Sequence, residues 1–503
     1  MDDPSPPMSF SFLGGVAKEE GYDVMVENLN AQYNNMSNGD VVGLIKREKP
    51  DIVGVHIFTN AARYSYELME EIRPYCEMII VGGPHATASP EEVLEKGGDV
   101  VFVGEAEVSF RNFLRALDKK KSLDKVKGII FKNSERVVDT GVEEVVFDLD
   151  EIPMPDKEVH RKSDYVKVDA EINNFGQILS TRGCPGRCTY CFSLFDKCFR
   201  IASAKKVFEE IKFLHENYGI DIINFIDDSF TVNRKRLYEL CDLLIDSKMG
   251  IKWTCGTRVD FLDREMIGKM KESGCKMIIL GIESAIPKTL LRMNKVLGLN
   301  GVTTPEKYVA RADDILRWCE ELDMRVGTNI LCGFPWESVE DMKEMQRYIN
   351  RIKYRITQGF YGGVLQPQPG TSMYDRYAKK YGFEKWWLYK EPLFKDDYRP
   401  FFMAHYHQYW DHIHNDFFNF DREYFRELNK LYKLMGKWNL YIFSRRRFKN
   451  PIVVWGVYSA VFLLSNISIG LFYVSPKLER KLMEGVKKFS YRFKFRKGDK
   501  RLN

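Results

Sequence analysis

The run Ser180–Phe192 reads Ser-Thr-Arg-Gly-Cys-Pro-Gly-Arg-Cys-Thr-Tyr-Cys-Phe, and it places Cys184, Cys188 and Cys191 at C-x3-C-x2-C spacing. Three thiols this close cannot pair off as disulfides without leaving one over. They are better suited to a soft metal centre, and on a four-iron cubane three ligands leave one iron open to another molecule. Zinc is the alternative, because Cys198 could serve as the fourth ligand that zinc normally requires.

Length and composition constrain the number of domains and the class of protein that carries this motif. The 503 residues, 44% of them hydrophobic, are enough for two or three domains. The other seven of the ten cysteines are scattered singly, which indicates reduced thiols in a cytoplasmic, anaerobic setting. The net charge of +5 gives no general nucleic-acid signal. The first residues lack the basic start and apolar core of a secretion signal.

Residues 1–150 alternate between strand and helix patterns. Helices are expected at 12–20 and 64–75. Continuous β-branched runs predict buried strands at 22–27, 51–57, 78–83 and 99–104. This alternation predicts a doubly wound parallel sheet, in which ligands bind beyond the carboxyl ends of the strands. The loop Gly82–Thr87 and the turn Gly104–Glu105 fall at those ends.

Residues 142–165 have little periodicity and resemble a linker into a second unit at 165–380. Helices are predicted there at 204–218, 234–247 and 306–319. Six strands are predicted at 177–182, 220–226, 251–256, 275–281, 325–333 and 359–365. Six such repeats predict a partial (β/α)6 barrel with its chemistry at the carboxyl ends of the strands.

The cysteine run at the end of the first barrel strand resembles the motif of the radical SAM enzymes. That resemblance implies a [4Fe-4S] cluster bound by Cys184, Cys188 and Cys191, whose open iron binds the amino and carboxylate groups of S-adenosylmethionine. It further implies reductive cleavage to a 5′-deoxyadenosyl radical, which abstracts hydrogen from the substrate. A reducing protein such as a ferredoxin or flavodoxin would supply the electron.

The same resemblance assigns cofactor contacts to residues at the strand ends. Tyr190 resembles the aromatic residue that flanks the adenine. Asp227 and Asp228 resemble the motif that accepts hydrogen bonds from the methionine amino group, for which a carboxylate is a suitable partner. Glu283 and Ser284 resemble the ribose-contacting motif. Any one of these carboxylates could instead cap a helix, as Asp228 could before the helix that follows it.

Two further contacts follow from the resemblance. Gly333 and Phe334 begin a turn, Gly-Phe-Pro-Trp-Glu, that resembles the segment packing on the adenine face. Arg258 resembles a basic residue near the carboxylate of the cofactor. The alternative for Arg258 is a salt bridge to Asp260, two residues further along the chain.

The first unit resembles the cobalamin-binding domain that precedes the barrel in one large radical SAM subclass. Pro6–Leu13, Gly82–Thr87 and Val103–Glu107 carry the match. The usual first strand, before Pro6, is missing, so the domain looks truncated. No Asp-x-His-x-x-Gly run is present, so no histidine is expected to bind cobalt from below. These departures leave cobalamin binding in doubt; the alternative is a degenerate domain that packs against or covers the active site.

Residues 381–503 carry no motif that points to a particular family, and their aromatic residues predict helices at 401–410 and 416–441. Half of the eight histidines lie there, either as metal ligands or as packing residues: His405, His407, His412 and His414. Residues 450–476 carry no charge and have basic flanks, which predicts a segment that spans or lies in a membrane. The basic and aromatic run 487–497 suits an anionic lipid surface. The alternative for 450–476 is a buried helical cap on the barrel.

Together these patterns predict a radical SAM enzyme on the cytoplasmic face of a membrane, held there peripherally or monotopically. Its expected substrate is hydrophobic, most plausibly a lipid chain, on which an unactivated carbon forms a new carbon–carbon bond. One alternative is a cobalamin-dependent methyltransferase acting on a tetrapyrrole, peptide or other small molecule. Another is a non-catalytic, cluster-bearing membrane scaffold. No nucleic-acid partner is expected.

Overall fold

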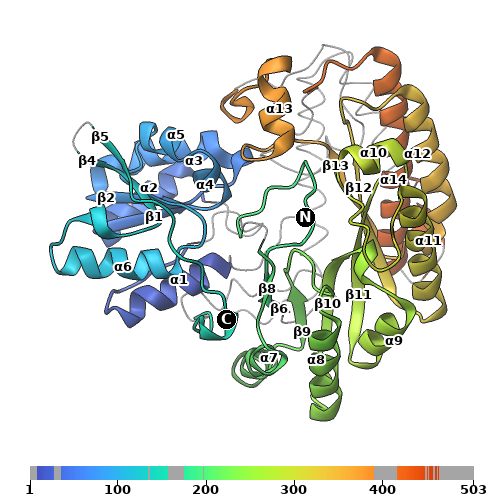
Figure 1. Cartoon of the computed structure of the whole chain (residues 1–503), viewed down its shortest axis with the longest axis horizontal. Helices are drawn as coiled ribbons and strands as arrows, with labels where there is room; N and C mark the ends of the chain where they lie inside the picture. The colour runs from blue at the N-terminus through green and yellow to red at the C-terminus, as the bar shows by residue number, and fades with distance from the viewer. Residues whose placement is uncertain are drawn as a thin grey trace.

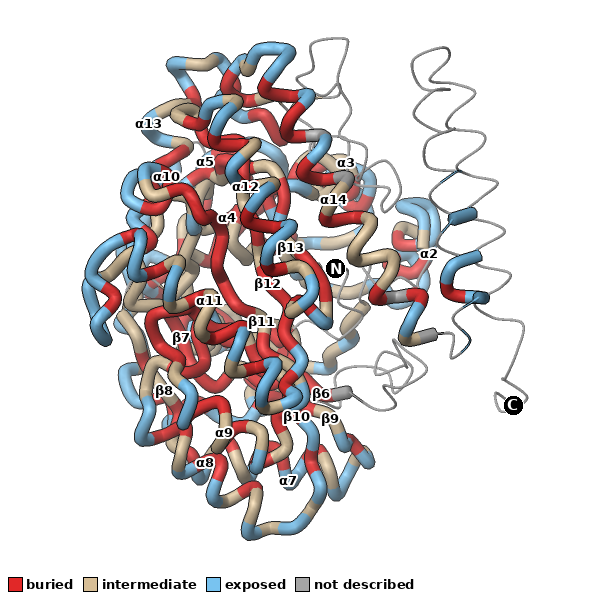
Figure 2. The backbone as a smooth tube through the Cα atoms, turned by 90° about the vertical axis from the view of Figure 1, so that its right-hand side faces the viewer, coloured by how far each residue is buried: buried red, intermediate tan, exposed pale blue. Residues whose placement is uncertain are grey.

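A computed structural model describes residues 8–27, 36–133, 136–156, 175–195, 198–389 and 416–447, together with 450, 452–456, 459–460 and 463. Two sheets stand side by side, each with its own helices, and the segment that carries the cysteines runs between them (Figure 1). Figure 2 shows buried backbone concentrated along the central strands of the second sheet, while the surrounding helices alternate between buried and exposed positions.

The first sheet has five strands in the order β1-β2-β3-β4-β5. β1 (Ile52–His56), β2 (Met78–Gly82) and β3 (Val100–Phe102) are parallel and lie at three of the predicted positions. These predicted parallel strands are therefore confirmed, and two strands that were not predicted extend the sheet: β4 (Ile129–Asn133) pairs antiparallel with β3, and β5 (Arg136–Asp139) pairs antiparallel with β4. The connection between β4 and β5 is too short for the crossover that parallel pairing requires.

Helices cover both faces of this sheet. They are α1 (Met8–Glu19), α2 (Asn38–Glu48), α3 (Ala62–Ile72), α4 (Pro84–Ala88), α5 (Pro90–Glu95) and α6 (Glu107–Asp118). Successive side chains of β2 point to opposite faces: Ile79 and Val81 enter one apolar cluster and Ile80 enters the other. A strand buried on both faces needs a continuous apolar run, which is the pattern that predicted β2.

The prediction of a strand at residues 22–27 is wrong. This segment follows α1 without regular structure, and Tyr22 instead donates a hydrogen bond from its hydroxyl to the Asp118 carboxylate at 2.7 Å. A strand needs a neighbour for its backbone groups. Among the described residues the sheet ends at β1, and no strand lies beside residues 22–27 to pair with them.

The second sheet has six parallel strands in the order β13-β12-β11-β10-β9-β6, which confirms the predicted six-stranded barrel segment. Its strands are β6 (Phe175–Ile178), β9 (Ile222–Phe225), β10 (Lys252–Arg258), β11 (Cys275–Glu283), β12 (Arg325–Cys332) and β13 (Gly359–Val364). Its helices are α7 (Ala204–Tyr218), α8 (Arg234–Ser247), α9 (Arg264–Glu272), α10 (Pro287–Arg292), α11 (Pro305–Glu321), α12 (Val339–Ile352) and α13 (Ser372–Tyr381).

The predicted bounds of α7 and α8 are confirmed, and their capping residues explain why. Ser203 caps α7 by accepting a hydrogen bond from the Lys206 amide, and Gly219 ends the helix in the left-handed conformation. Asn233 caps α8 in the same way. Because Asn233 is the cap, the alternative role of Asp228 as the cap of this helix is wrong.

The tail contributes one long helix, α14 (Arg422–Arg447), in place of the helix predicted at 416–441. It packs against α12 and β13 and covers that edge of the second sheet (Figure 1). Asn439 accepts a hydrogen bond from the Phe360 amide at 2.7 Å and donates one to the Phe360 carbonyl at 2.8 Å. The Asn439 side chain therefore pairs with the open backbone of β13, as a further strand would.

Other predictions for the tail fall largely outside the described residues. These include the helix at 401–410, the four histidines His405, His407, His412 and His414, and most of 450–476. Within the described part of the chain, no helix combines the length and the apolar character needed to cross a bilayer.

The pairing of Asn439 with β13 gives a stability prediction. Asn439→Ala should lower the free energy of unfolding by about 1–3 kcal/mol, because it leaves an amide and a carbonyl of Phe360 unpaired beneath α14. Urea unfolding followed by circular dichroism measures this. Asn350→Ala, an exposed position on α12, is the matched control and should change it by less than about 0.5 kcal/mol. Equal effects of the two changes would contradict this account of the sheet edge.

Candidate functional site

The three cysteines lie on one loop at the carboxyl end of β6. The loop leaves the short strand β7 (Thr181–Arg182) and returns at β8 (Arg200–Ile201), which pairs with β7 antiparallel. Cys184 and Cys188 are half-buried and Cys191 is exposed, and none forms a disulfide. The loop lies between the two sheets (Figure 1).

Hydrogen bonds to the barrel hold this loop in place. The Thr189 amide donates to the Met293 carbonyl at 3.0 Å, and the Thr189 carbonyl accepts from the Met373 amide at 3.0 Å. The Asn294 side chain donates to the Arg187 carbonyl at 3.0 Å. The end of α10 and the start of α13 therefore fix the positions of the cysteines between them.

The donor set of this loop fits an iron–sulfur cluster. In the described residues, no group of three His, Cys, Asp or Glu side chains is arranged to hold a single metal ion. A cubane needs no such group, because each thiolate binds a different iron. The Gly186 amide donates to Cys184 Sγ at 3.4 Å. Burial raises the pKa of Cys184, so cluster binding has to displace a proton from that thiol.

The two aspartates after β9 have different surroundings. Asp227 is buried and accepts hydrogen bonds from the Ser180 hydroxyl, at 3.0 Å, and from the Thr181 amide. It thereby fixes the strand that leads into the cysteine loop. Asp228 is exposed, and partial removal from bulk water raises the pKa of its carboxyl group. Of the pair, Asp228 is the better placed to meet a ligand, and both assigned roles stay predictions.

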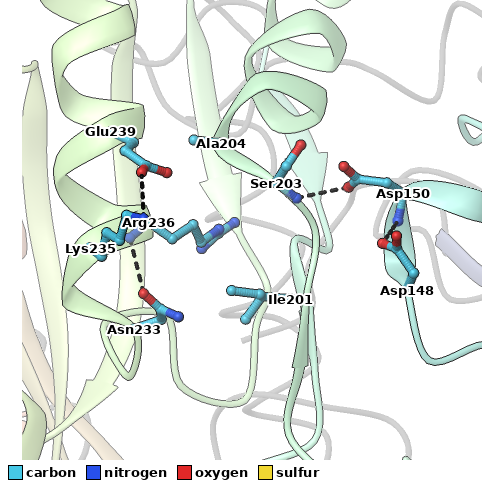
Figure 3. Close-up of a pocket in the computed structure, with 9 residues that line it drawn as sticks. All are labelled: Asp148, Asp150, Ile201, Ser203, Ala204, Asn233, Lys235, Arg236 and Glu239. Atoms are coloured by element: carbon cyan, nitrogen blue, oxygen red, sulfur yellow. Dashed lines mark hydrogen bonds and ion pairs between the residues drawn. The ribbon is translucent and has the colours of Figure 1, made fainter.

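The positive charge of Arg236 acts on Asp227. The Arg236 side chain also reaches into a cavity of about 430 Å³ (Figure 3). The cavity is lined by Asp148, Asp150, Ile201, Ser203, Ala204, Asn233, Lys235, Arg236 and Glu239. Burial raises the pKa of Asp227, and the positive charge of Arg236 opposes that rise. None of the predicted cofactor contacts lines this cavity, so it is separate from the candidate site.

A buried ion pair occupies the end of β11. The Lys295 ammonium lies 3.2 Å from a Glu283 carboxylate oxygen and 3.5 Å from the Tyr190 hydroxyl. Glu283 has a φ of +65°, an uncommon backbone conformation for a non-glycine residue that concentrates at functional sites. No role was predicted for Lys295 from the sequence. The structure places it beside two of the predicted contacts, Tyr190 and Glu283.

Ser284 is turned away from these residues. Its hydroxyl accepts a hydrogen bond from the Ile286 amide at 3.1 Å, and its side chain is fully buried beside the Met345 sulfur. The structure thus brings Tyr190 and Glu283 together and places Ser284 in the core. The ribose contact assigned to Ser284 stays a prediction that these hydrogen bonds do not favour.

The turn after β12 depends on a buried carboxylate and on the tail. Gly333 has a φ of +89°, and its amide donates to Glu337 at 2.8 Å; the Phe334 amide donates to the same oxygen at 3.1 Å. The Tyr424 hydroxyl, from α14, donates to that oxygen at 3.0 Å. The ring centroid of Phe334 lies 6.1 Å from that of Tyr190, so two predicted adenine contacts are neighbours.

The first domain meets the cysteine loop through buried ion pairs. Glu105, at the carboxyl edge of the first sheet, pairs with both Arg182 and Arg200, and Arg182 also pairs with Glu107. The arginine side chains are 4% and 1% exposed, so few water molecules can replace these contacts. The two arginines stand at the two ends of the cysteine loop, so the edge of the first domain is fixed against it.

The same edge of the first domain has features that fit a bound group. A side chain added at Gly82 or Gly104 would have open space in front of it. His56, at the end of β1, has a buried Nε2 atom without a hydrogen-bond partner among the described residues, and burial lowers its pKa to about 4. The open space at Gly82 and Gly104, next to a neutral His56 imidazole, leaves room for a large ligand such as cobalamin.

Comparison with known proteins agrees with both halves of this site. Residues 3–114 match the family model of the B12 binding domain, and residues 178–349 match that of the radical SAM superfamily. The chain belongs to the radical SAM enzymes that carry an N-terminal cobalamin-binding domain. Its cofactors are therefore a [4Fe-4S] cluster, S-adenosylmethionine and cobalamin, and the match to the B12 binding domain favours cobalamin binding over the alternative of a degenerate domain.

Individual relatives support this assignment. An uncharacterized methyltransferase of Pyrococcus horikoshii is 29% identical over 74% of this chain and 78% of its own length. Among solved structures, the cobalamin-dependent S-adenosylmethionine radical enzyme OxsB has a TM-score of 0.65 at 16% identity, over 97% of this chain and 73% of its own. The radical S-adenosylmethionine methyltransferase TsrM of Kitasatospora setae has a TM-score of 0.60 at 17% identity, over 75% and 72%.

Glu337 gives a pH-dependent prediction for this radical SAM enzyme. Burial raises the pKa of Glu337 to about 7, from an ordinary value of 4.5. The folded state then holds a proton that the unfolded state has lost between about pH 4.5 and 7, so stability falls as the pH rises through that window. Glu337→Gln keeps an acceptor oxygen but cannot ionise. The free energy of unfolding of Glu337→Gln, relative to that of wild type, should therefore be about 1–3 kcal/mol higher at pH 8 than at pH 5.

Urea unfolding of both proteins at the two pH values measures this difference. Glu340→Gln, at an exposed position of α12, is the control and should leave the pH dependence of wild type unchanged. A pH dependence in Glu337→Gln equal to that of wild type would show that another group is responsible.

Proposed function

We propose that this enzyme is a cobalamin-dependent methyltransferase that transfers a methyl group to a carbon atom of an organic substrate. The observation that carries the proposal is the placement of the two cofactor domains. Glu105, at the edge of the cobalamin-binding domain, pairs with Arg182 and Arg200 at the two ends of the cysteine loop. A methyl carrier has to meet the carbon from which hydrogen is removed, and this contact holds the two sites against each other.

The side chains of the site divide between the cofactors. Cys184, Cys188 and Cys191 bind the cluster. Asp228 accepts hydrogen bonds from the amino group of S-adenosylmethionine, while Tyr190 and Phe334 flank its adenine. The cluster and S-adenosylmethionine supply the means to remove hydrogen from carbon, and cobalamin supplies the methyl group. The Pyrococcus relative and TsrM, which are both described as methyltransferases, support methyl transfer over other radical reactions.

The relatives favour methyl transfer over the lipid-chain reaction that the sequence placed first. A tetrapyrrole, a peptide or another small molecule is therefore the leading substrate class. A membrane lipid is the second candidate, because three apolar side chains of the described tail are open to solvent: Ile452 is 80%, Trp455 67% and Leu463 61% exposed. Exposed apolar side chains are found on surfaces that meet an apolar partner, and a lipid bilayer is one such partner.

The test uses the anaerobically reconstituted holoenzyme with S-adenosylmethionine that carries a deuterated methyl group, in an extract from cells that lack the enzyme. We expect one equivalent of bound corrinoid and a labelled methyl group on a carbon of one metabolite. The triple variant Cys184→Ala, Cys188→Ala, Cys191→Ala should lose the product by at least a hundredfold, whereas Cys198→Ala should retain it.

The fraction that contains the label separates the substrate classes. Label in the aqueous or pigment fraction supports a tetrapyrrole, a peptide or another small molecule as the substrate, and label in the lipid fraction supports a membrane lipid. Cleavage of S-adenosylmethionine to 5′-deoxyadenosine by a protein that binds no corrinoid would overturn methyl transfer altogether.

A further inference from the structure

Arg258 makes an unusual set of contacts at the end of β10. Its Nε and Nη2 atoms each lie 2.8 Å from one carboxylate oxygen of Asp260, and Nη2 also donates to the Lys295 carbonyl. Its remaining nitrogen, Nη1, donates to Cys188 Sγ at 3.5 Å. The guanidinium thus connects a buried carboxylate on one side with a predicted cluster ligand on the other.

This guanidinium has little freedom to move. Arg258 is buried, and Asp260 is fully buried with its own carbonyl bound by the Asn300 side chain at 2.7 Å. A bidentate pair with a carboxylate fixes both the position and the plane of an arginine. Four of the five N–H donors of Arg258 already have protein partners, so the carboxylate of the cofactor would have to compete for them.

The cysteine loop has room for the Arg258 guanidinium because residue 186 is a glycine. A side-chain carbon at Gly186 would lie 2.7 Å from Arg258 Nη1 and 3.3 Å from Cys184 Sγ, and the first distance is too short for a normal contact. Only glycine at this position leaves room for Nη1 beside the two thiols. The Gly186 of the Cys-Pro-Gly-Arg-Cys run therefore serves the contact between Arg258 and Cys188 directly.

We propose that Arg258 is a positioning residue that raises the reduction potential of the cluster through its N–H···S hydrogen bond to Cys188. Hydrogen bonds to cluster sulfurs and nearby positive charge both stabilise the reduced state, which carries one more negative charge. In that step the cluster takes up one electron from the reductant and no covalent bond forms or breaks. The proposal rests on the assigned cluster and not on the identity of the substrate.

The test is a redox titration of the reconstituted cluster with dithionite and mediators, followed by electron paramagnetic resonance in the absence of S-adenosylmethionine. Arg258→Gln should lower the ratio of reduced to oxidised cluster at a fixed potential at least tenfold, which is about 59 mV for a one-electron couple. Arg258→Lys keeps the charge but loses the planar guanidinium group with its several N–H donors. Its reduction potential should therefore lie between those of wild type and Arg258→Gln. Gly186→Ala should shift the potential in the same direction by displacing Nη1.

Arg234→Lys is the matched control, because Arg234 also pairs with an aspartate, Asp263, but is exposed on α8. It should leave the potential unchanged. A potential equal to that of wild type in a cluster-loaded Arg258→Gln variant would overturn the proposal. If that variant fails to assemble its cluster, Arg258→Lys and Gly186→Ala decide in the same way. Failure of methyl transfer would leave this measurement unaffected, so the two proposals can fail separately.

Discussion

One carboxylate of the first domain faces two buried arginines at the ends of the cysteine loop, and the geometry of the site depends on that contact. Glu105 belongs to the segment that resembles the cobalamin motif, and Arg182 stands two residues before Cys184. Removing one partner of a buried pair leaves an uncompensated charge, so such pairs resist separation. The edge of the cobalamin domain is therefore held against the loop that binds the cluster.

The remaining contacts of the site extend this constraint. Asp227 fixes the strand that enters the cysteine loop, and the ends of α10 and α13 fix its middle. The tail also contributes, because the Tyr424 hydroxyl reaches the carboxylate that organises the Gly333 turn. A second interdomain contact joins Glu92 of the first domain to the Trp387 indole at 2.8 Å. Elements far apart in sequence thus converge on one face of the molecule.

Local sequence predicted much of this fold because most elements carry their own signals. The limits of α7 and α8 could be predicted from their caps and apolar spacing. The strand at 22–27 failed because a strand forms only beside a partner, and its pattern does not reveal that the partner is missing. The pair β4 and β5 was missed because its strands are short and include charged residues such as Lys132 and Arg136.

Some residues of the candidate site could likewise be predicted from the sequence, whereas other contacts could not. The spacing of the cysteines predicted Cys184 as a metal ligand, and the family resemblance predicted Asp228 and Glu283 as cofactor contacts, because such signals depend on neighbours in the chain. The partners of Arg258 could not be predicted, since Asp260, Lys295 and Cys188 meet only in the folded barrel. Lys295 itself had no local signal that assigned it a role.

If the cluster and cobalamin share one site, their unpaired electrons should interact when both groups are bound. The measurement is electron paramagnetic resonance of the anaerobic holoenzyme, with the cluster reduced and cobalamin in its Co(II) form. Each signal should be broadened or split compared with protein that holds only one of the groups. Two independent, unperturbed signals from fully loaded protein would contradict a shared site.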